Sequence, residues 1–253
     1  MYPVLVLTFI VLFWQFASGL FNVPDYLLPK PSAIAKEFVL EIGTLWSHGL
    51  ITLWEVLIGF AISVAIAIPL AILIVYSVAM ERALYPLLVI SQVIPKVSIA
   101  PLFVVWLGFG LYPKVIIVFL IAFFPIVIDT IVGLRSVEDD MIDLVRSMGA
   151  GPVKTFMKIR LPAALPNIFG GLKVAITLAV VGAVVAEFVG SDRGLGYLLL
   201  VATGQLNTEL LFASIAFLSA MGMALFMVME IGERLLLGAR RKDYMKIATE
   251  GTM

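Results

Sequence analysis

Few side chains in this sequence are of the types that carry out covalent or metal chemistry. Cysteine is absent and His48 is the single histidine. The chain therefore has no disulfide framework and no thiolate nucleophile, and a histidine-based metal centre is disfavoured. It also lacks the G-x4-G-K-[ST] loop that cradles nucleotide phosphates. These features argue against a membrane enzyme, which would need clustered nucleophiles, bases or metal ligands.

The remaining candidates are charged and polar side chains within long apolar stretches. Lys96 follows a proline, with Gln92 and Ser98 close by, and Glu187 ends another apolar stretch. Ionisable groups inside a membrane are costly, so each is a candidate for function. Lys96 is the basic residue best suited to meet an anionic solute; alternatively, it lies near an interface and extends its amine to water. Glu187 either caps a gate or pairs with Arg193. We place Gln92, Lys96, Ser98 and Glu187 on a candidate translocation path.

The composition indicates whether these charged and polar side chains lie in a soluble protein or in a membrane protein. Hydrophobic residues make up 62% of the 253 residues and charged residues 13%, whereas soluble domains are nearer half apolar and a quarter charged. The chain is therefore expected to be an all-α integral membrane protein surrounded by lipid. Its net charge is zero, which gives no reason to expect a nucleic-acid partner.

The apolar stretches predict about six transmembrane helices, since a span needs about 20 apolar residues. They cover roughly 3–21, 50–77, 84–106, 113–134, 164–189 and 210–236. The first lacks the basic start of a secretory signal, so we interpret it as a retained helix. Two prolines interrupt the third. We interpret the other charged residues in or near the spans as structural: Glu55, Asp129, Lys173, Glu230 and Glu233.

Basic residues between the spans predict the orientation. Segment 135–162 holds five and the C-terminal end another five, whereas the opposite side has four, at Lys30, Lys36, Lys114 and Arg193. Cytoplasmic loops are enriched in lysine and arginine, so both termini and segment 135–162 are expected in the cytoplasm.

We expect three regions along the chain. Residues 1–49 form the first span and an outer loop, where Ser32 is expected to cap a short amphipathic helix. The apolar stripe of that helix is formed by Ile34, Phe38, Ile42 and Trp46. Residues 50–236 form the transmembrane domain, and 237–253 form a basic cytoplasmic tail. The segment 193–210 is too short and too polar to span, so we expect a short outer helix with Gly194 and Gly196 at a tight turn.

Segment 135–162 has helical order despite its polarity. Met141, Leu144, Val145 and Met148 predict one apolar helical face. Gly149 is expected to end that helix with a positive φ, and Pro152 to start a second one that stops at Leu161-Pro162. The product is a helix–glycine–helix elbow that either docks into a partner's groove or folds back on its own bundle.

This elbow resembles the cytoplasmic signature E-A-A-x3-G-x9-I-x-L-P of permease subunits of bacterial ABC importers. Gly149 is followed by nine residues and then by Ile159-Arg160-Leu161-Pro162. In the first half Asp143 keeps a carboxylate, while Leu144 and Val145 replace the two alanines. The stretches "YLLPKPSAI", "IPKVSIAPLFVVWLGFG" and "GLGYLL" are similar to the nitrate, sulfonate and taurine branch, which includes permeases for thiamine-precursor pyrimidines and riboflavin.

The resemblance implies a type I importer transmembrane domain in a bacterial inner membrane, without enzymatic activity of its own. ATP and Mg would be bound by separate ATPase subunits. A second permease copy would complete a homodimer, and a periplasmic or lipid-anchored binding protein would deliver the solute. The ATPase would contact Asp143, Gly149, Ala150, Val153, Phe156, Ile159, Leu161 and Pro162. The solute would be sulfonate-, nitrate- or taurine-like, or alternatively a pyrimidine or riboflavin. A stand-alone secondary transporter is the competing class.

Overall fold

The structure is a computed structural model that describes residues 2–20, 24 and 26–250. Each regular element among these residues is a helix, as the composition predicts. Residues 21–23 and 25, at the end of the predicted first span and in the outer loop, lie outside the described residues. So do residues 251–253 of the predicted tail.

Among the described residues, four helices are long and apolar enough to cross a membrane. They are α3 (Ile42–Tyr76), α6 (Leu111–Leu134), α9 (Leu161–Gly190) with the helical turns before it, and α11 (Thr208–Glu250). A fifth candidate is broken: α4 (Val78–Val93) meets the helical segment Lys96–Leu107 at an angle of 83°. That segment consists of the 3₁₀ turn η1 (Lys96–Ile99) and α5 (Ala100–Leu107).

The break in the third predicted span has a local cause. Ile94 and Pro95 have extended backbone conformations, with ψ of 123° and 92°. Proline has no N–H and disfavours helical geometry in the residue before it. The predicted interruption is therefore confirmed.

The first predicted span corresponds to α1 (Tyr2–Leu20). This helix has 19 residues, none of them charged. Its Trp14 ring lies 5.6 Å from that of Phe212 on α11. That α1 crosses the membrane, and so brings the number of spans to six, stays a prediction.

The core lies where α3, α6 and α9 pack together. Val56, Ala67, Val118, Ile126 and Ala179 are all fully buried there. Alanines of α9 recur in this core, and small side chains let membrane helices approach closely. The three helices form the frame that holds the polar groups described below.

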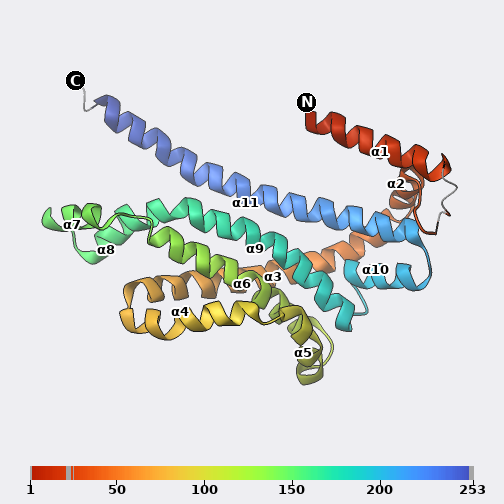
Figure 1. Cartoon of the computed structure of the whole chain (residues 1–253), viewed down its shortest axis with the longest axis horizontal. Coiled ribbons are helices and arrows are strands. Elements are labelled where there is room, and N and C mark those ends of the chain that lie inside the picture. Colours follow the sequence, from red (N-terminus) through yellow and green to blue (C-terminus); the bar gives the residue numbers. More distant parts are fainter. Residues whose placement is uncertain (1, 21–23, 25, 251–253) are drawn as a thin grey trace.

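Figure 1 shows different elements at the two ends of the bundle. The helices α7 (Asp139–Ser147) and α8 (Pro152–Thr155) lie at one end with the α3–α4 turn. An ion pair of 2.7 Å between Arg135 and Glu81 joins the end of α6 to the start of α4 at that end. The helices α2 (Pro31–Leu40) and α10 (Leu195–Gly204) lie at the other end.

The short helix expected after the first span is present as α2, but its start differs from the prediction. Pro31 occupies the first turn and Lys30 the capping position, so Ser32 does not cap. Proline suits the first turn because its φ is already helical. Ser32 instead accepts a hydrogen bond from the side-chain amide of Gln15, and its backbone N–H donates to Gln15 Oε1.

The predicted apolar stripe runs through two helices. Ile34 and Phe38 of α2 pack against the cluster formed by α10 and the start of α11. Ile42 and Trp46 already belong to α3, which begins at Ile42. The second span therefore starts about two turns earlier than predicted.

Candidate functional site

The elbow has the backbone geometry expected from its sequence. Helix α7 ends with Met148 in the C-cap position, and Gly149 has φ of +84°. The Gly149 N–H donates to the Arg146 carbonyl and the Ala150 N–H to the Val145 carbonyl. This pair of bonds is the Schellman motif, which favours glycine at the left-handed position. Pro152 then occupies the first turn of α8. The predictions for Gly149 and Pro152 are confirmed.

The elbow carries apolar side chains on its exposed surface. Met148 and Val153 are 79% and 75% exposed, and Met141, Leu144 and Met157 are also exposed. We call these five residues the elbow patch. Asp143 beside them forms an exposed ion pair with Arg146 at 3.6 Å.

Other residues assigned to the elbow face its own bundle. The ring of Phe156 lies edge-on to Tyr76 at 5.8 Å between centroids. Leu161 packs beside Leu134 and Ile168. Ala150, Ile159 and Pro162 are half-buried. The outward surface thus belongs to the elbow patch, whereas Phe156 and Leu161 anchor the elbow.

The prediction that Leu161-Pro162 stops the second helix is wrong. The helix continues from α8 through the π-helical turn η2 (Phe156–Arg160) into α9. The Leu161 N–H reaches the carbonyl of Phe156, five residues back. A π turn is wider than an α turn and accommodates Pro162, which has no N–H to donate.

The structure places two of the predicted path residues at one cavity. It has a volume of about 400 Å³ and lies between the α4–η1 break, α6 and α9, with these lining residues: Gln92, Lys96, Ile121, Phe124, Pro125, Ile128, Asp129 and Leu178. The Lys96 Nζ lies 4.3 Å from the centroid of the Phe124 ring and 3.5 Å from the Gln92 carbonyl oxygen. Ser98 is exposed on η1 and does not line this cavity.

Asp129 is the residue of this cavity that the sequence prediction left out. It lies on α6 close to Gly171 of α9, where a β-carbon would come within 3.0 Å of the Asp129 Oδ2. The absence of a side chain at Gly171 is what leaves room for the carboxylate. The sequence feature that could have indicated Asp129 is Pro125, which lies one helical turn before it on α6.

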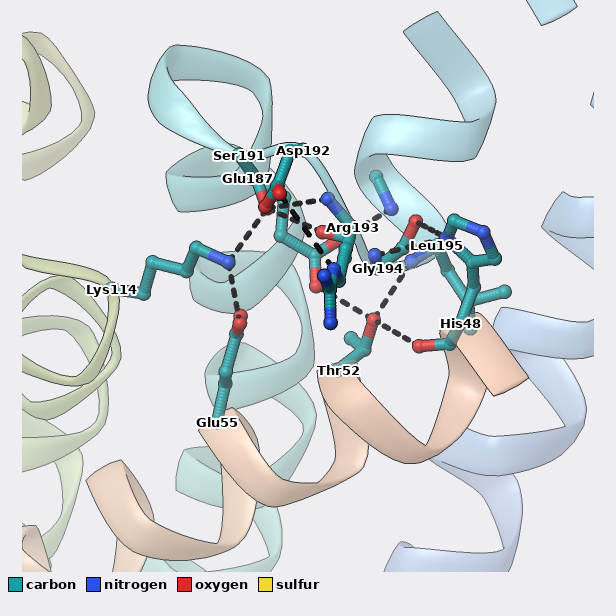
Figure 2. Close-up of polar contacts among 11 residues, drawn as sticks. His48, Thr52, Glu55, Lys114, Glu187, Ser191, Asp192, Arg193, Gly194 and Leu195 are labelled. Atoms are coloured by element: carbon teal, nitrogen blue, oxygen red, sulfur yellow. Dashed lines mark hydrogen bonds and ion pairs between the residues drawn. The ribbon is translucent and has the colours of Figure 1, made fainter. Parts of the chain in front are cut away.

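Glu187 lies elsewhere, in a polar network at the end of the bundle that holds α10 (Figure 2). It is fully buried. It accepts a hydrogen bond of 2.7 Å from the Thr52 hydroxyl and another from the Gly196 N–H. Arg193 points to Asp192 instead, at 3.6 Å. The predicted Glu187–Arg193 pair is therefore wrong: backbone and hydroxyl donors satisfy this carboxylate.

The turn before α10 is built around Glu187. A β-carbon on Gly194 would lie 2.1 Å from the Glu187 Oε1, and Gly194 has φ of +108°. His48 Nδ1 lies 3.0 Å from both the N and the O of Gly194. The Leu195 N–H donates to the Thr52 hydroxyl at 2.8 Å. The short helix and the tight turn at Gly194 are confirmed.

A buried ion pair completes this end of the bundle. Lys114, predicted to lie in an outer link, is on α6 and contacts Glu55 Oε1 of α3 at 2.7 Å. Its Nζ also donates to the Ser191 hydroxyl at 2.6 Å. Glu55, predicted to be interfacial, is only 1% exposed. Both residues are structural, but neither is where the charge pattern predicted it. We call the contacts among Thr52, Glu55, Lys114, Glu187, Ser191 and Gly194–Gly196 the outer network.

A solved structure shows the class of fold. One chain of the MetNI methionine ABC transporter, solved in inward-facing conformations, superposes on this chain with a TM-score of 0.63. It shares 20% identity with this chain, and the match covers 79% of this chain and 97% of that one. The bundle thus has the fold of the transmembrane domain of a type I ABC importer.

The chain belongs to the family of binding-protein-dependent transport system inner membrane components, whose description matches residues 63–242. Similar proteins include the formylaminopyrimidine transport permease protein ThiX of Halalkalibacterium halodurans, with 36% identity over 95% of this chain and 96% of its own length. The riboflavin transport system permease protein RibX of Chloroflexus aurantiacus has 38% identity over 91% and 87%. The putative aliphatic sulfonates transport permease protein SsuC of Bacillus subtilis has 33% identity over 84% and 78%.

Family membership decides between the competing classes. The chain is an ABC importer permease subunit embedded in the membrane, and it works with an ATPase in a separate chain and with a binding protein. It is a transport subunit without enzymatic activity of its own. The stand-alone secondary transporter and the membrane enzyme are both set aside.

Proposed function

We propose that two copies of this chain form the membrane path of an importer in a bacterial inner membrane, with two ATPase subunits on the cytoplasmic side. ATP and Mg are bound by those subunits, and a periplasmic or lipid-anchored binding protein delivers the solute. One set of spans and one elbow per chain supports a homodimer, because an importer with two ATPases needs two elbows. Residues 50–236 form the transmembrane domain and 237–253 the cytoplasmic tail.

The elbow patch is the observation that carries this proposal. Apolar side chains this exposed at the tip of a polar segment are suited to a protein groove. Arg146 and Lys154 flank the patch, and the elbow lies at the same end as Arg135 and the C-terminal part of α11. This distribution of basic residues supports a cytoplasmic elbow and cytoplasmic termini.

Engineered cysteines test the docking directly, because the chain has none of its own. Val153→Cys and Ala150→Cys should cross-link to the ATPase subunit in the intact complex. Thr177→Cys, an exposed position within α9, serves as the matched control and should not. If the elbow cysteines react only with reagents added outside the cell, the orientation and the docking role both fail.

The number of permease copies is tested separately. Native mass spectrometry of the complex should show two identical permease chains and two ATPase chains. A complex with one copy, or with a second, different permease, contradicts the homodimer.

The solute is proposed from the relatives and the cavity together. The similar proteins are named for a pyrimidine, riboflavin and aliphatic sulfonates. Lys96 and Gln92 supply polar groups to a cavity within a broken span, and such breaks line substrate sites in other transporters. A small organic or anionic solute passes this cavity on its way through the membrane.

A further inference from the structure

The cavity at Lys96 contains both a cation and an anion that have no ionic partner. Within the described part of the chain, neither Lys96 nor Asp129 takes part in an ion pair, although both line the same cavity. Lys96 has only a ring face and a long contact to a carbonyl in its own turn. No hydrogen-bond donor within the described residues reaches the Asp129 carboxylate.

Unpaired charges of both signs are unexpected in an apolar bundle. Charged residues in membrane segments normally pair with one another or face a water-filled path. Here the two side chains come from different elements, the η1 turn and α6, and face one shared space. The arrangement leaves a cationic and an anionic contact point available to a third molecule.

One residue of the cavity lining also has a backbone carbonyl without its usual helical donor. Pro125 has no N–H, so the carbonyl of Ile121, one turn earlier on α6, lacks its usual intrahelical donor. Both residues line the cavity. The lining of the cavity therefore includes the Lys96 ammonium, the Asp129 carboxylate, the Gln92 side chain and the Phe124 ring.

We propose that this cavity binds the solute in transit, and that the solute carries an anionic or acceptor group for Lys96 together with an N–H donor for Asp129. An aminosulfonate or an amino-substituted heteroaromatic ring has both features. Nitrate and simple alkanesulfonates have only the first, and Asp129 repels them. The volume of about 400 Å³ falls within the range of small-molecule sites, roughly 300–1,000 Å³. This inference rests on the proposed translocation path.

The first experiment measures occupancy of the cavity in the complete transporter. Gln92→Cys places a thiol on the lining, and Ser98→Cys places one nearby but outside it. Both are labelled with a charged, water-soluble thiol reagent in the presence of taurine, formylaminopyrimidine or ethanesulfonate. Taurine and ethanesulfonate form a matched pair that differs by one amino group.

We expect taurine or formylaminopyrimidine to slow labelling of Gln92→Cys by about tenfold at saturation, with no effect of ethanesulfonate and no protection of Ser98→Cys. If Gln92→Cys is not labelled at all, the cavity is not accessible to water. The proposal that the solute passes through this cavity then fails. If it is labelled but no probe protects it, or ethanesulfonate protects it equally, the path stands and this inference is overturned.

The second experiment assigns the two contacts. Asp129→Asn should weaken protection by the amino-bearing probe about tenfold or more, the usual effect of losing a charge-assisted hydrogen bond. It should also remove the discrimination against ethanesulfonate. Lys96→Gln should weaken protection by both taurine and formylaminopyrimidine. Glu41→Gln and Lys36→Gln neutralise charges outside the cavity and should leave protection unchanged. Unchanged selectivity in Asp129→Asn contradicts the assignment.

Discussion

Two of the places where the bundle holds charged side chains, the outer network and the Lys96 cavity, differ in how those side chains are paired. In the outer network, Lys114 contacts both Glu55 and Ser191, while Glu187 accepts from Thr52 and from a backbone N–H. In the Lys96 cavity, the cation and the carboxylate of Asp129 are not paired. The difference separates charges that hold the fold from charges kept available for another molecule.

The energetic consequence is opposite at the two sites. Removing one partner from a buried ion pair leaves an uncompensated charge, which is strongly destabilising. Removing a charge that has no partner removes only a desolvation cost. Stability and transport should therefore separate: the outer network should control the first and the cavity the second.

Loss of the Lys114 ammonium should have the largest effect on stability. Lys114→Met leaves Glu55 buried without its cation, at a cost of about 3–5 kcal/mol. We expect a large fall in the melting temperature of the purified permease. Glu55→Gln combined with Lys114→Met should recover much of that loss. A single variant as stable as the parent would show that the network does not hold the fold.

The Thr52 hydroxyl should have the next largest effect. Thr52→Val removes the donor to Glu187 and should cost roughly 1.5–3 kcal/mol, as for hydrogen bonds to charged groups. Thr130 provides the matched control, since its buried hydroxyl has no partner within the described chain. Thr130→Val should leave the melting temperature unchanged or raise it. Equal effects at the two threonines would contradict the network.

A smaller loss of stability is expected in the elbow. A β-carbon on Gly149 meets no atom within 4 Å, so Gly149→Val should cost about 1 kcal/mol through its positive φ alone. The same change should abolish substrate-stimulated ATP hydrolysis, because it redirects α8 and the elbow patch. Gly170→Val, at an equally open helical position, is the control. Normal stimulation in Gly149→Val would separate the elbow from coupling.

The cavity charges should have the smallest effect on stability. Lys96→Gln and Asp129→Asn should each change the melting temperature little or raise it slightly, since neither breaks an ion pair. Transport driven by the complete complex should nevertheless fall. A melting temperature lowered as far as in Lys114→Met would show that these two residues are structural.

Local features of the fold were predictable from the sequence, whereas pairings across the bundle were not. Gly149 and Pro152 determine the elbow through their own backbone preferences, so the sequence was sufficient there. The partner of Glu55 lies 59 positions away, and nothing in the charge pattern indicates that Lys114 turns inward. Glu187 was matched to Arg193 because they are close in sequence, but Thr52 is nearer in space. Leu161-Pro162 was misinterpreted because the π turn before it accommodates a proline within a continuous helix.

The uninterrupted run of helix from Pro152 to Gly190 has a mechanical consequence. Its 39 residues give a rod of about 58 Å at about 1.5 Å per residue. One end carries the elbow, Leu178 borders the cavity, and Glu187 lies near the other end. A tilt of roughly 6° about the middle of such a rod would move each end by about 3 Å in opposite directions. A rigid rod of this kind would transmit a push on the elbow to the opposite end of the bundle without any refolding in between.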